Sequence, residues 1–169
     1  PVVAIHSPCL LITQRVWGTE PWAKLERSAE MAKELDADVV VVHPPYRWQT
    51  AYRSWVDERL SAVAAERGVR IAVENMFPLR VRGRSIARFH ARQSLEDLEG
   101  FPDVTLDTSH LAVAGLDPVE TLSRLGDRLA HAHARGVMHR RLTADAIVRT
   151  PERGCPVCVR HWDDARSLD

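Results

Sequence analysis

Residues 39–45 have the sequence Val-Val-Val-Val-His-Pro-Pro, four branched apolar residues that stop at His43. The run has no polar alternation, which is the pattern of a parallel strand buried on both faces. The two prolines that follow cannot continue a central strand, so the strand ends at the histidine. We therefore predict a buried parallel strand that carries an imidazole at its carboxyl end.

The same arrangement occurs at four other places in the chain. In each, a short and largely apolar run ends on a residue that can bind a metal ion or move a proton: 2–5 before His6, 71–73 before Glu74, 104–106 before Asp107 and 129–130 before His131. In chain order, with His43 included, the terminal residues are 37, 31, 33 and 24 positions apart, the length of one strand plus one helix. The repeat predicts an α/β fold of the (β/α) TIM-barrel type, with about five strand–helix units and the reactive groups on one rim.

The segments between these strands contain helix signals. The apolar spacing predicts helices over residues 21–35, 49–67 and 119–125, and Gly68 is the residue type favoured just after a helix end. Ser94 and Asp97 predict a capped helical turn at residues 95–98. Residues 76–93 lose this periodicity and contain five arginines. They predict a long rim loop with a short helix near residues 86–90.

The composition is that of an ordinary soluble globular protein, with 169 residues of which 45% are hydrophobic and 27% charged. A net charge of zero argues against a partner that is simply a polyanion, although a local basic patch stays open. No apolar stretch reaches the roughly 18 residues needed to span a membrane, and no secretion signal is visible. Three cysteines are too few for a disulfide framework. We expect a cytoplasmic location.

The strand-end residues form a plausible ligand set for a divalent ion. A single histidine at a strand end is more often structural, but five such groups at a repeating interval favour one shared site. Glu74 and Asp107 would carry carboxylates into the barrel mouth, where an unpaired charge is costly, and His131 and His133 lie on one face of their strand. Mixed oxygen and nitrogen donors suit Mn²⁺, Zn²⁺ or Co²⁺. Such an ion supports either proton transfer next to a carbonyl or attack of water on a phosphodiester.

The strand ends also carry a family resemblance. The five runs that end at Ser7-Pro8, Pro44-Pro45, Glu74-Asn75, Ser109-His110 and Ala132-His133 resemble, in the same order, the strand-end motifs of xylose isomerase-like barrels. This superfamily includes sugar phosphate isomerases and epimerases and the endonuclease IV group. The resemblance covers about residues 2–133. It implies a metal-dependent isomerase or epimerase of a sugar or sugar phosphate that uses proton abstraction and a metal-stabilised enediolate.

The resemblance also implies roles for single residues. Glu74, Asp107 and His131 match the shared metal ligands, and Glu74 can also act as a base. His110 matches a substrate-contacting histidine, which we assign a catalytic role as well. His6 and His43 match additional zinc ligands of the endonuclease IV branch. We expect further substrate contacts from His133, from Trp48 in the aromatic loop and from Arg80 in the arginine-rich loop. The alternative for the arginine-rich loop is that it is exposed to solvent and binds no phosphate.

The chain departs from the family pattern after His133. No later residue matches the final glutamate ligand, and about five of eight barrel units are visible. We therefore expect a partial barrel domain over residues 1–133 and a divergent, poorly ordered tail over 134–169. A completing chain or a second copy could close the barrel. An endonuclease IV-like zinc phosphodiesterase acting on abasic DNA and a catalytically inactive remnant of the isomerase family stay open as alternatives.

Overall fold

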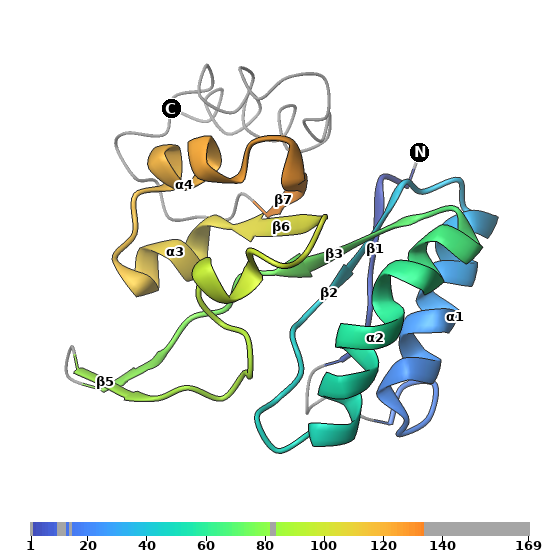
Figure 1. The fold of residues 1–169 in the computed structure, drawn as a ribbon, viewed down its shortest axis with the longest axis horizontal. Helices are drawn as coiled ribbons and strands as arrows, with labels where there is room; N and C mark the ends of the chain where they lie inside the picture. Colours follow the sequence, from blue (N-terminus) through green and yellow to red (C-terminus); the bar gives the residue numbers. More distant parts are fainter. Residues whose placement is uncertain (1, 10–12, 14, 82–83, 134–169) are drawn as a thin grey trace, which may run out of the picture.

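A five-stranded parallel sheet forms the centre of the protein. The structure, a computed structural model, describes residues 2–9, 13, 15–81 and 84–133, without the side chains of residues 79–86. In these residues the strands lie in the order β1-β2-β3-β6-β7 and form half of a barrel (Figure 1). The predicted partial TIM-barrel architecture is confirmed. The predicted tail over 134–169 lies outside the described residues.

Each predicted strand is present at nearly the predicted position. The bounds are β1 Ala4–His6, β2 Val39–Val42, β3 Arg70–Glu74, β6 Val104–Asp107 and β7 Leu129–His133. All four neighbouring pairs are parallel. Their carboxyl ends therefore meet at one edge of the sheet, where the predicted ligands lie.

Helices cover the outer face of this sheet. The helices α1 (Pro21–Glu34) and α2 (Thr50–Arg67) lie side by side against β1, β2 and β3 (Figure 1). The short helices α3 (Thr108–Ala114) and α4 (Pro118–Leu125) lie on the other side of the molecule near β7. Gly68 ends α2 with a φ of 67°, a left-handed conformation that glycine adopts at little cost. None of the helices in the described part of the chain is long and apolar enough to cross a membrane.

Side chains alternate between the two faces of the sheet. One face packs against the helices, and the other faces the inside of the half-barrel. Leu25 and Ala29 of α1 pack with Val40 and Val42, all at most 2% exposed, in the core between the sheet and the helices. The inner face holds small residues, since Val39 and Val41 pack there with Ala4, Ala72 and Ala130. Two residues further toward the carboxyl end, Ala4, Val41 and Ala72 are followed by the predicted ligands His6, His43 and Glu74.

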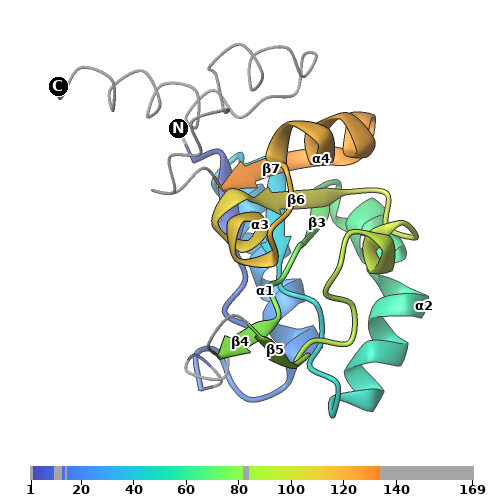
Figure 2. The ribbon, with the colours of Figure 1, turned by 90° about the vertical axis from the view of Figure 1, so that its left-hand side faces the viewer.

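Residues 76–93 differ from the prediction of a loop with a short helix. They contain the antiparallel hairpin β4 (Leu79–Val81) and β5 (Arg84–Ala87), so the helix expected near residues 86–90 was wrong. The hairpin projects away from β6 and β7 (Figure 2). The predicted capping box is confirmed, because Ser94 N–H donates to Asp97 Oδ2 at 3.0 Å and Ser94 Oγ accepts from Asp97 N–H at 3.4 Å. The helical element that follows is a 3₁₀ turn, η2 (Glu96–Leu98), whose N-cap position is Leu95.

Candidate metal centre

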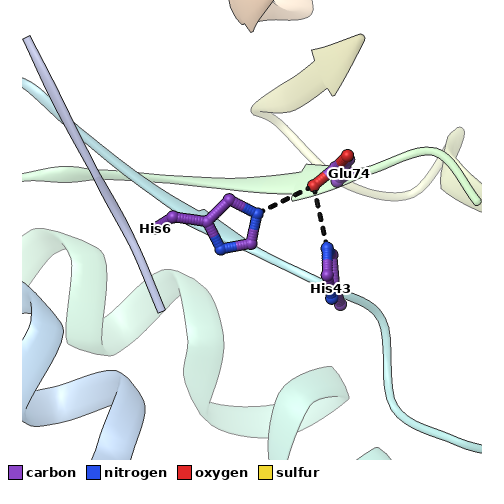
Figure 3. Close-up of side chains that lie close together, drawn as sticks. All are labelled: His6, His43 and Glu74. Carbon is purple, nitrogen blue, oxygen red and sulfur yellow. Dashed lines mark hydrogen bonds and ion pairs between the residues drawn. The ribbon is translucent and has the colours of Figure 1, made fainter. Parts of the chain in front are cut away.

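Glu74 lies at the centre of a cluster of imidazoles at the carboxyl edge of the sheet. Its carboxylate is 2% exposed. Oε2 lies 3.1 Å from Nε2 of both His6 and His43, which come from the carboxyl ends of β1 and β2 (Figure 3). Oε1 lies 3.5 Å from His110 Nδ1 and 3.3 Å from His133 Nδ1. Four histidines therefore face this buried carboxylate.

These contacts set the ionisation of Glu74. Burial alone would raise the pKa of its carboxyl group, because a charge is costly away from water. Hydrogen bonds from His133, His43 and His6 outweigh burial and hold the pKa of Glu74 well below its usual range. Glu74 is therefore a carboxylate at neutral pH.

The tautomer of His6 shows that the cluster suits a cation. Nδ1 of His6 lies 3.1 Å from the backbone carbonyl of Ser7, so Nδ1 carries the proton and donates it to that oxygen. In a neutral ring, Nε2 would then direct its lone pair at Glu74 Oε2, 3.1 Å away. Two lone pairs at this distance repel each other unless a proton or a metal ion lies between them.

Asp107 is held by the start of α3. One oxygen, Oδ1, accepts hydrogen bonds from the N–H groups of Ser109 and His110 at 2.7 and 3.0 Å, and a further one from the Ser109 hydroxyl. This is the usual bonding of a helix N-cap. The other oxygen, Oδ2, lies 3.7 Å from His133 Nδ1. Asp107 therefore keeps one oxygen directed into the cluster.

Asn75 forms hydrogen bonds with two of the site residues, a role that its position after Glu74 did not predict. Asn75 is 2% exposed. Its side-chain oxygen accepts a hydrogen bond from the Asp107 backbone N–H at 2.6 Å, and its side-chain nitrogen donates one to the Asp107 backbone oxygen at 3.3 Å. Its own carbonyl accepts a hydrogen bond from His110 Nδ1 at 2.7 Å. This bond places the proton of His110 on Nδ1 and leaves Nε2 as a lone-pair donor.

The two histidines of β7 lie in different surroundings. His133 is in register with Asp107, whereas His131 is in register with Thr105, two residues nearer the amino end. Burial lowers the pKa of His133, but its bonds to Asp107 and Glu74 raise it to about 9. Burial, together with the charge of the nearby His133, lowers the pKa of His131 to about 4. His133 thus contacts both carboxylates, while the predicted ligand His131 lies deeper and forms no ion pair with them.

Donor atoms of the described residues fall into two groups that could hold a metal ion, and the groups share one residue. His6, His43 and Glu74 place one ligand atom each within 4.8 Å of one another, and so do Glu74, Asp107 and His110. Both groups combine carboxylate oxygen with imidazole nitrogen, a donor set that fits Zn²⁺, Mn²⁺ or Co²⁺. The expected metal-binding cluster is therefore present in the form of a histidine and carboxylate site.

The predicted substrate contacts are only partly described. Trp48 is 55% exposed at the rim, where it stacks on Tyr46. The backbone of Arg80 lies in β4, but its side chain is outside the described residues. Two other arginines of this loop, Arg88 and Arg92, form ion pairs with Asp97 and Asp57. These carboxylates reduce the positive charge that the arginine-rich loop could offer to a phosphate.

The fold and the site define a class of protein: a β/α barrel with a histidine and carboxylate cluster at the carboxyl rim of its strands. The family model of the xylose isomerase-like TIM barrel matches residues 13–157. This chain belongs to the xylose isomerase-like TIM barrel family.

The chain is also similar to curated proteins of two mycobacteria. The chain is 42% identical over 151 residues to an uncharacterized protein of Mycobacterium tuberculosis and 41% identical over 152 residues to one of Mycobacterium leprae. Each match covers 79% of this chain and 54% of the relative, so the chain spans about half the length of the curated relatives it matches.

Two solved structures share the fold. A D-tagatose 3-epimerase-like protein is similar with a TM-score of 0.53 at 21% identity, over 79% of this chain and 56% of its own. The 3-keto-D-glucoside 4-epimerase YcjR of E. coli is similar with a TM-score of 0.53 at 17% identity, over 79% of this chain and 58% of its own.

Proposed function

We propose that the protein is a metal-dependent isomerase or epimerase of a sugar or sugar phosphate. The observation that carries the proposal is the buried Glu74 carboxylate, faced by nitrogen atoms of His6, His43, His110 and His133 at 3.1–3.5 Å. Family membership supports it, as do the names of the two structures with a similar fold, which are those of sugar epimerases or epimerase-like proteins.

The metal would be held by Glu74 and Asp107 together with histidines of the cluster. His133 is the β7 histidine with direct contacts to both carboxylates, and His131 is the one the family resemblance implies. His6 and His43 complete the donor set on the side of β1 and β2. A bound divalent ion supplies positive charge that polarises the substrate carbonyl and acidifies the neighbouring C–H bond.

The residues of this chain would then move the protons. Glu74 remains a carboxylate, the form that can accept a proton, although its lowered pKa makes it a weak base in the metal-free protein. His110 offers a second acceptor, because its bond to the Asn75 carbonyl leaves Nε2 unprotonated. The ring of Phe77 packs against that of His110 with a centroid distance of 4.7 Å. We therefore assign Glu74 and His110 as the proton-transfer pair.

Metal analysis combined with an exchange assay tests this function. Purified protein and the Glu74→Gln variant would be analysed for Mn, Zn and Co, then incubated in D₂O with a panel of ketoses, aldoses and their phosphates. We expect bound metal and incorporation of deuterium next to the carbonyl, with both lost in Glu74→Gln. The matched control is Glu66→Gln, since Glu66 is 59% exposed and far from the cluster. Metal binding that survives Glu74→Gln, or folded protein without metal or exchange, would refute the proposal.

A second candidate function is a zinc phosphodiesterase that acts on abasic DNA. The observation that favours it is the sharing of Glu74 between two groups of ligands, one of which contains both His6 and His43. Several bound zinc ions together with nicking of an abasic duplex would support this function over the isomerase. Bound metal without either activity would instead support the third alternative, an inactive member of the family.

A further inference from the structure

His43 is held in the cluster differently from His6 and His110. The rings of His6 and His110 are each oriented by a backbone carbonyl that accepts the proton of Nδ1, at 3.1 and 2.7 Å. His43 is 8% exposed, and its Nδ1 has no hydrogen-bond partner among the described residues. Histidines that bind a metal ion are usually oriented by a hydrogen bond from the second ring nitrogen. Other contacts must therefore hold the His43 ring in place.

The two residues after His43 can form backbone hydrogen bonds only through their carbonyl groups. Both are prolines, which have no N–H to donate. Each carbonyl accepts a bond from the segment after β5, since His90 Nδ1 donates to Pro44 at 2.7 Å and Ala91 N–H donates to Pro45 at 2.8 Å. A carbonyl oxygen only accepts, so the proton of His90 lies on Nδ1. The His90 side chain therefore fixes the residue that comes directly after His43.

Further contacts join the loop after β2 to the segment that contains His90. Tyr46 and His90 form an antiparallel β-bridge, and Arg47 N–H donates to the Phe89 carbonyl at 2.8 Å. His90 is 6% exposed. Its ring stacks on that of Tyr46 with a centroid distance of 4.5 Å and packs edge to face with that of His43 at 6.3 Å. The bond to Pro44 is thus part of a buried connection between the two segments.

We infer that His90 is a positioning residue of the metal centre. Its Nδ1–H bond to the Pro44 carbonyl fixes the backbone at the end of β2 and so holds Nε2 of His43 beside Oε2 of Glu74, 3.1 Å away. The inference rests on the metal site of the proposed function and adds a residue to it. His90 belongs to neither ligand group of the described residues, so it acts on the ion through His43.

Two variants of nearly the same shape isolate this hydrogen bond. In His90→Asn the amide nitrogen takes the place of Nδ1 and can donate to the Pro44 carbonyl, whereas His90→Leu has no donor. Both variants lose the imidazole ring, so a difference between them comes from the polar amide. The matched control is Gln93→Leu, since Gln93 is 4% exposed on the same segment and its side-chain oxygen has no hydrogen-bond partner in the described part of the chain. Circular dichroism checks that each variant is folded.

Zn²⁺ affinity and the NMR spectra of the histidine rings test the inference. Isothermal titration with Zn²⁺ gives the affinity, and long-range ¹H–¹⁵N spectra show which ring nitrogen carries a proton or a metal ion, in metal-free and in Zn²⁺-loaded protein. The His43 and His90 signals are assigned by their loss in His43→Gln and in the His90 variants. In wild-type protein we expect His90 to be protonated on Nδ1 in both forms, and Nε2 of His43 to show a metal-bound shift on loading.

Loss of an outer hydrogen-bond partner lowers the metal affinity of a site by roughly 10–100-fold. Because His90 acts through the backbone, we expect the lower end of this range: His90→Leu should bind Zn²⁺ about tenfold more weakly and shift the His43 ring signals. His90→Asn should recover most of the affinity and the wild-type His43 signals, and Gln93→Leu should change neither. Equal Zn²⁺ affinities of the Asn and Leu variants overturn the inference. A metal-bound shift on a His90 nitrogen also overturns it, because His90 would then be a ligand.

The proposed function and the role of His90 can fail separately. Absence of deuterium exchange, with the difference between His90→Asn and His90→Leu intact, would remove the isomerase and keep the positioning role. Exchange together with equal Zn²⁺ affinities of the two variants would do the reverse. If the protein binds no Zn²⁺, the metal-free spectra decide, because only a positioning role shifts the His43 signals in His90→Leu and not in His90→Asn. If His90→Leu does not fold, a wild-type His90 ring protonated on Nε2 instead of Nδ1 refutes the bond to Pro44.

Discussion

Replacing Asn75 by leucine should destabilise the protein more than any other single polar substitution at the rim. Asn75 is the sole asparagine of the chain, and its side chain bonds both to the backbone N–H and to the backbone oxygen of Asp107. Both bonds are buried. Leucine has nearly the same shape but neither donor nor acceptor. The substitution therefore leaves the buried Asp107 N–H without a partner and removes one of the hydrogen bonds to the Asp107 oxygen, which as the N-cap carbonyl of α3 also accepts a helical N–H.

The size of the effect follows from these two groups. A buried N–H left without a partner costs about 1–3 kcal/mol and the lost bond at the oxygen about 1 kcal/mol more, so the free energy of unfolding should fall by roughly 2–4 kcal/mol. A domain of this size is stable by about 5–15 kcal/mol in total. The variant should therefore stay folded at low temperature and unfold at a clearly lower denaturant concentration.

The companion variant Asn75→Asp separates hydrogen bonding from shape. At high pH it keeps the acceptor for Asp107 N–H but turns an amide donor into a carboxylate that faces a carbonyl oxygen. It also lies beside the charged groups of Glu74 and Asp107. Burial and these charges raise the pKa of the introduced carboxyl in the folded state, so its deficit relative to wild type should shrink as pH falls. Asn75→Leu has no such group, and its deficit should not change with pH in this way.

Urea denaturation followed by circular dichroism at pH 5 and pH 8 measures both effects. The m-value should stay at the wild-type value, which shows that the same surface unfolds. A fall of less than about 1 kcal/mol in Asn75→Leu would refute the reasoning, since it would mean that the two bonds contribute nothing net. An unchanged Asn75→Asp deficit at the two pH values would refute the assigned role of the amide donor.

Three other predictions concern the site and the core. In metal-free protein, NMR titration should show that His133 keeps its proton up to a pKa of about 9 and His131 stays neutral down to about 4. The raised pKa of His133 contributes stability that is complete below its unfolded-state pKa of about 6.5 and is lost as pH rises through about 9. The lowered pKa of His131 has the opposite effect, so the protein loses stability as pH falls from about 6.5 toward about 4. A shared titration midpoint near the ordinary histidine value of about 6.5 for the two histidines would contradict both expected pKa shifts. Gly68→Ala should cost about 1 kcal/mol in urea denaturation, because φ is 67° while no atom lies within 4 Å of the added methyl group; no loss would show that the helix end adjusts. Leu25 is 0% exposed, so Leu25→Ala should lower the free energy of unfolding by about 2–5 kcal/mol. Leu35 is 47% exposed, so Leu35→Ala should lower it by less than about 0.5 kcal/mol. Equal losses of stability in the two variants would show that Leu25 is not part of the core.

The sheet could be predicted from the sequence because its signals are local. Val39–Val42 is apolar at every position, as a strand covered on both faces requires, and Gly68 marks the end of α2 where the backbone turns left-handed. The hairpin β4–β5 could not be predicted. Its strands pair only with each other and have three and four residues, too few to establish a strand period. The helix α3 was missed for a related reason, because its seven residues are too few to establish a helical period.

The sequence predicted which strand-end residues gather in the site, but it did not predict the hydrogen bonds between them and their neighbours. Side chains at the carboxyl ends of parallel strands must meet, which is why His6, His43, Glu74 and Asp107 could be grouped without a structure. Their hydrogen-bond partners depend on loops and on helix starts far away in the sequence. Asn75 is an example, since its bonds to Asp107 span 32 positions and leave no periodic pattern.

The register of β7 explains how one residue of the site comes to differ from the family expectation. The sequence motif predicts only that His131 and His133 share a face, because two residues on a strand are one full alternation apart. An irregularity beside Val104 places Thr105 opposite His131 and Asp107 opposite His133. The carboxyl groups of Glu74 and Asp107 therefore both face His133, and the positive charge they stabilise lies on this histidine. A position that holds a proton between two carboxylates is also suited to a metal ion, so we expect His133→Ala to reduce metal affinity more than His131→Ala does. Isothermal titration with Zn²⁺ and Mn²⁺ measures the difference, and a larger loss in His131→Ala would show that binding of the ion shifts the register of β7.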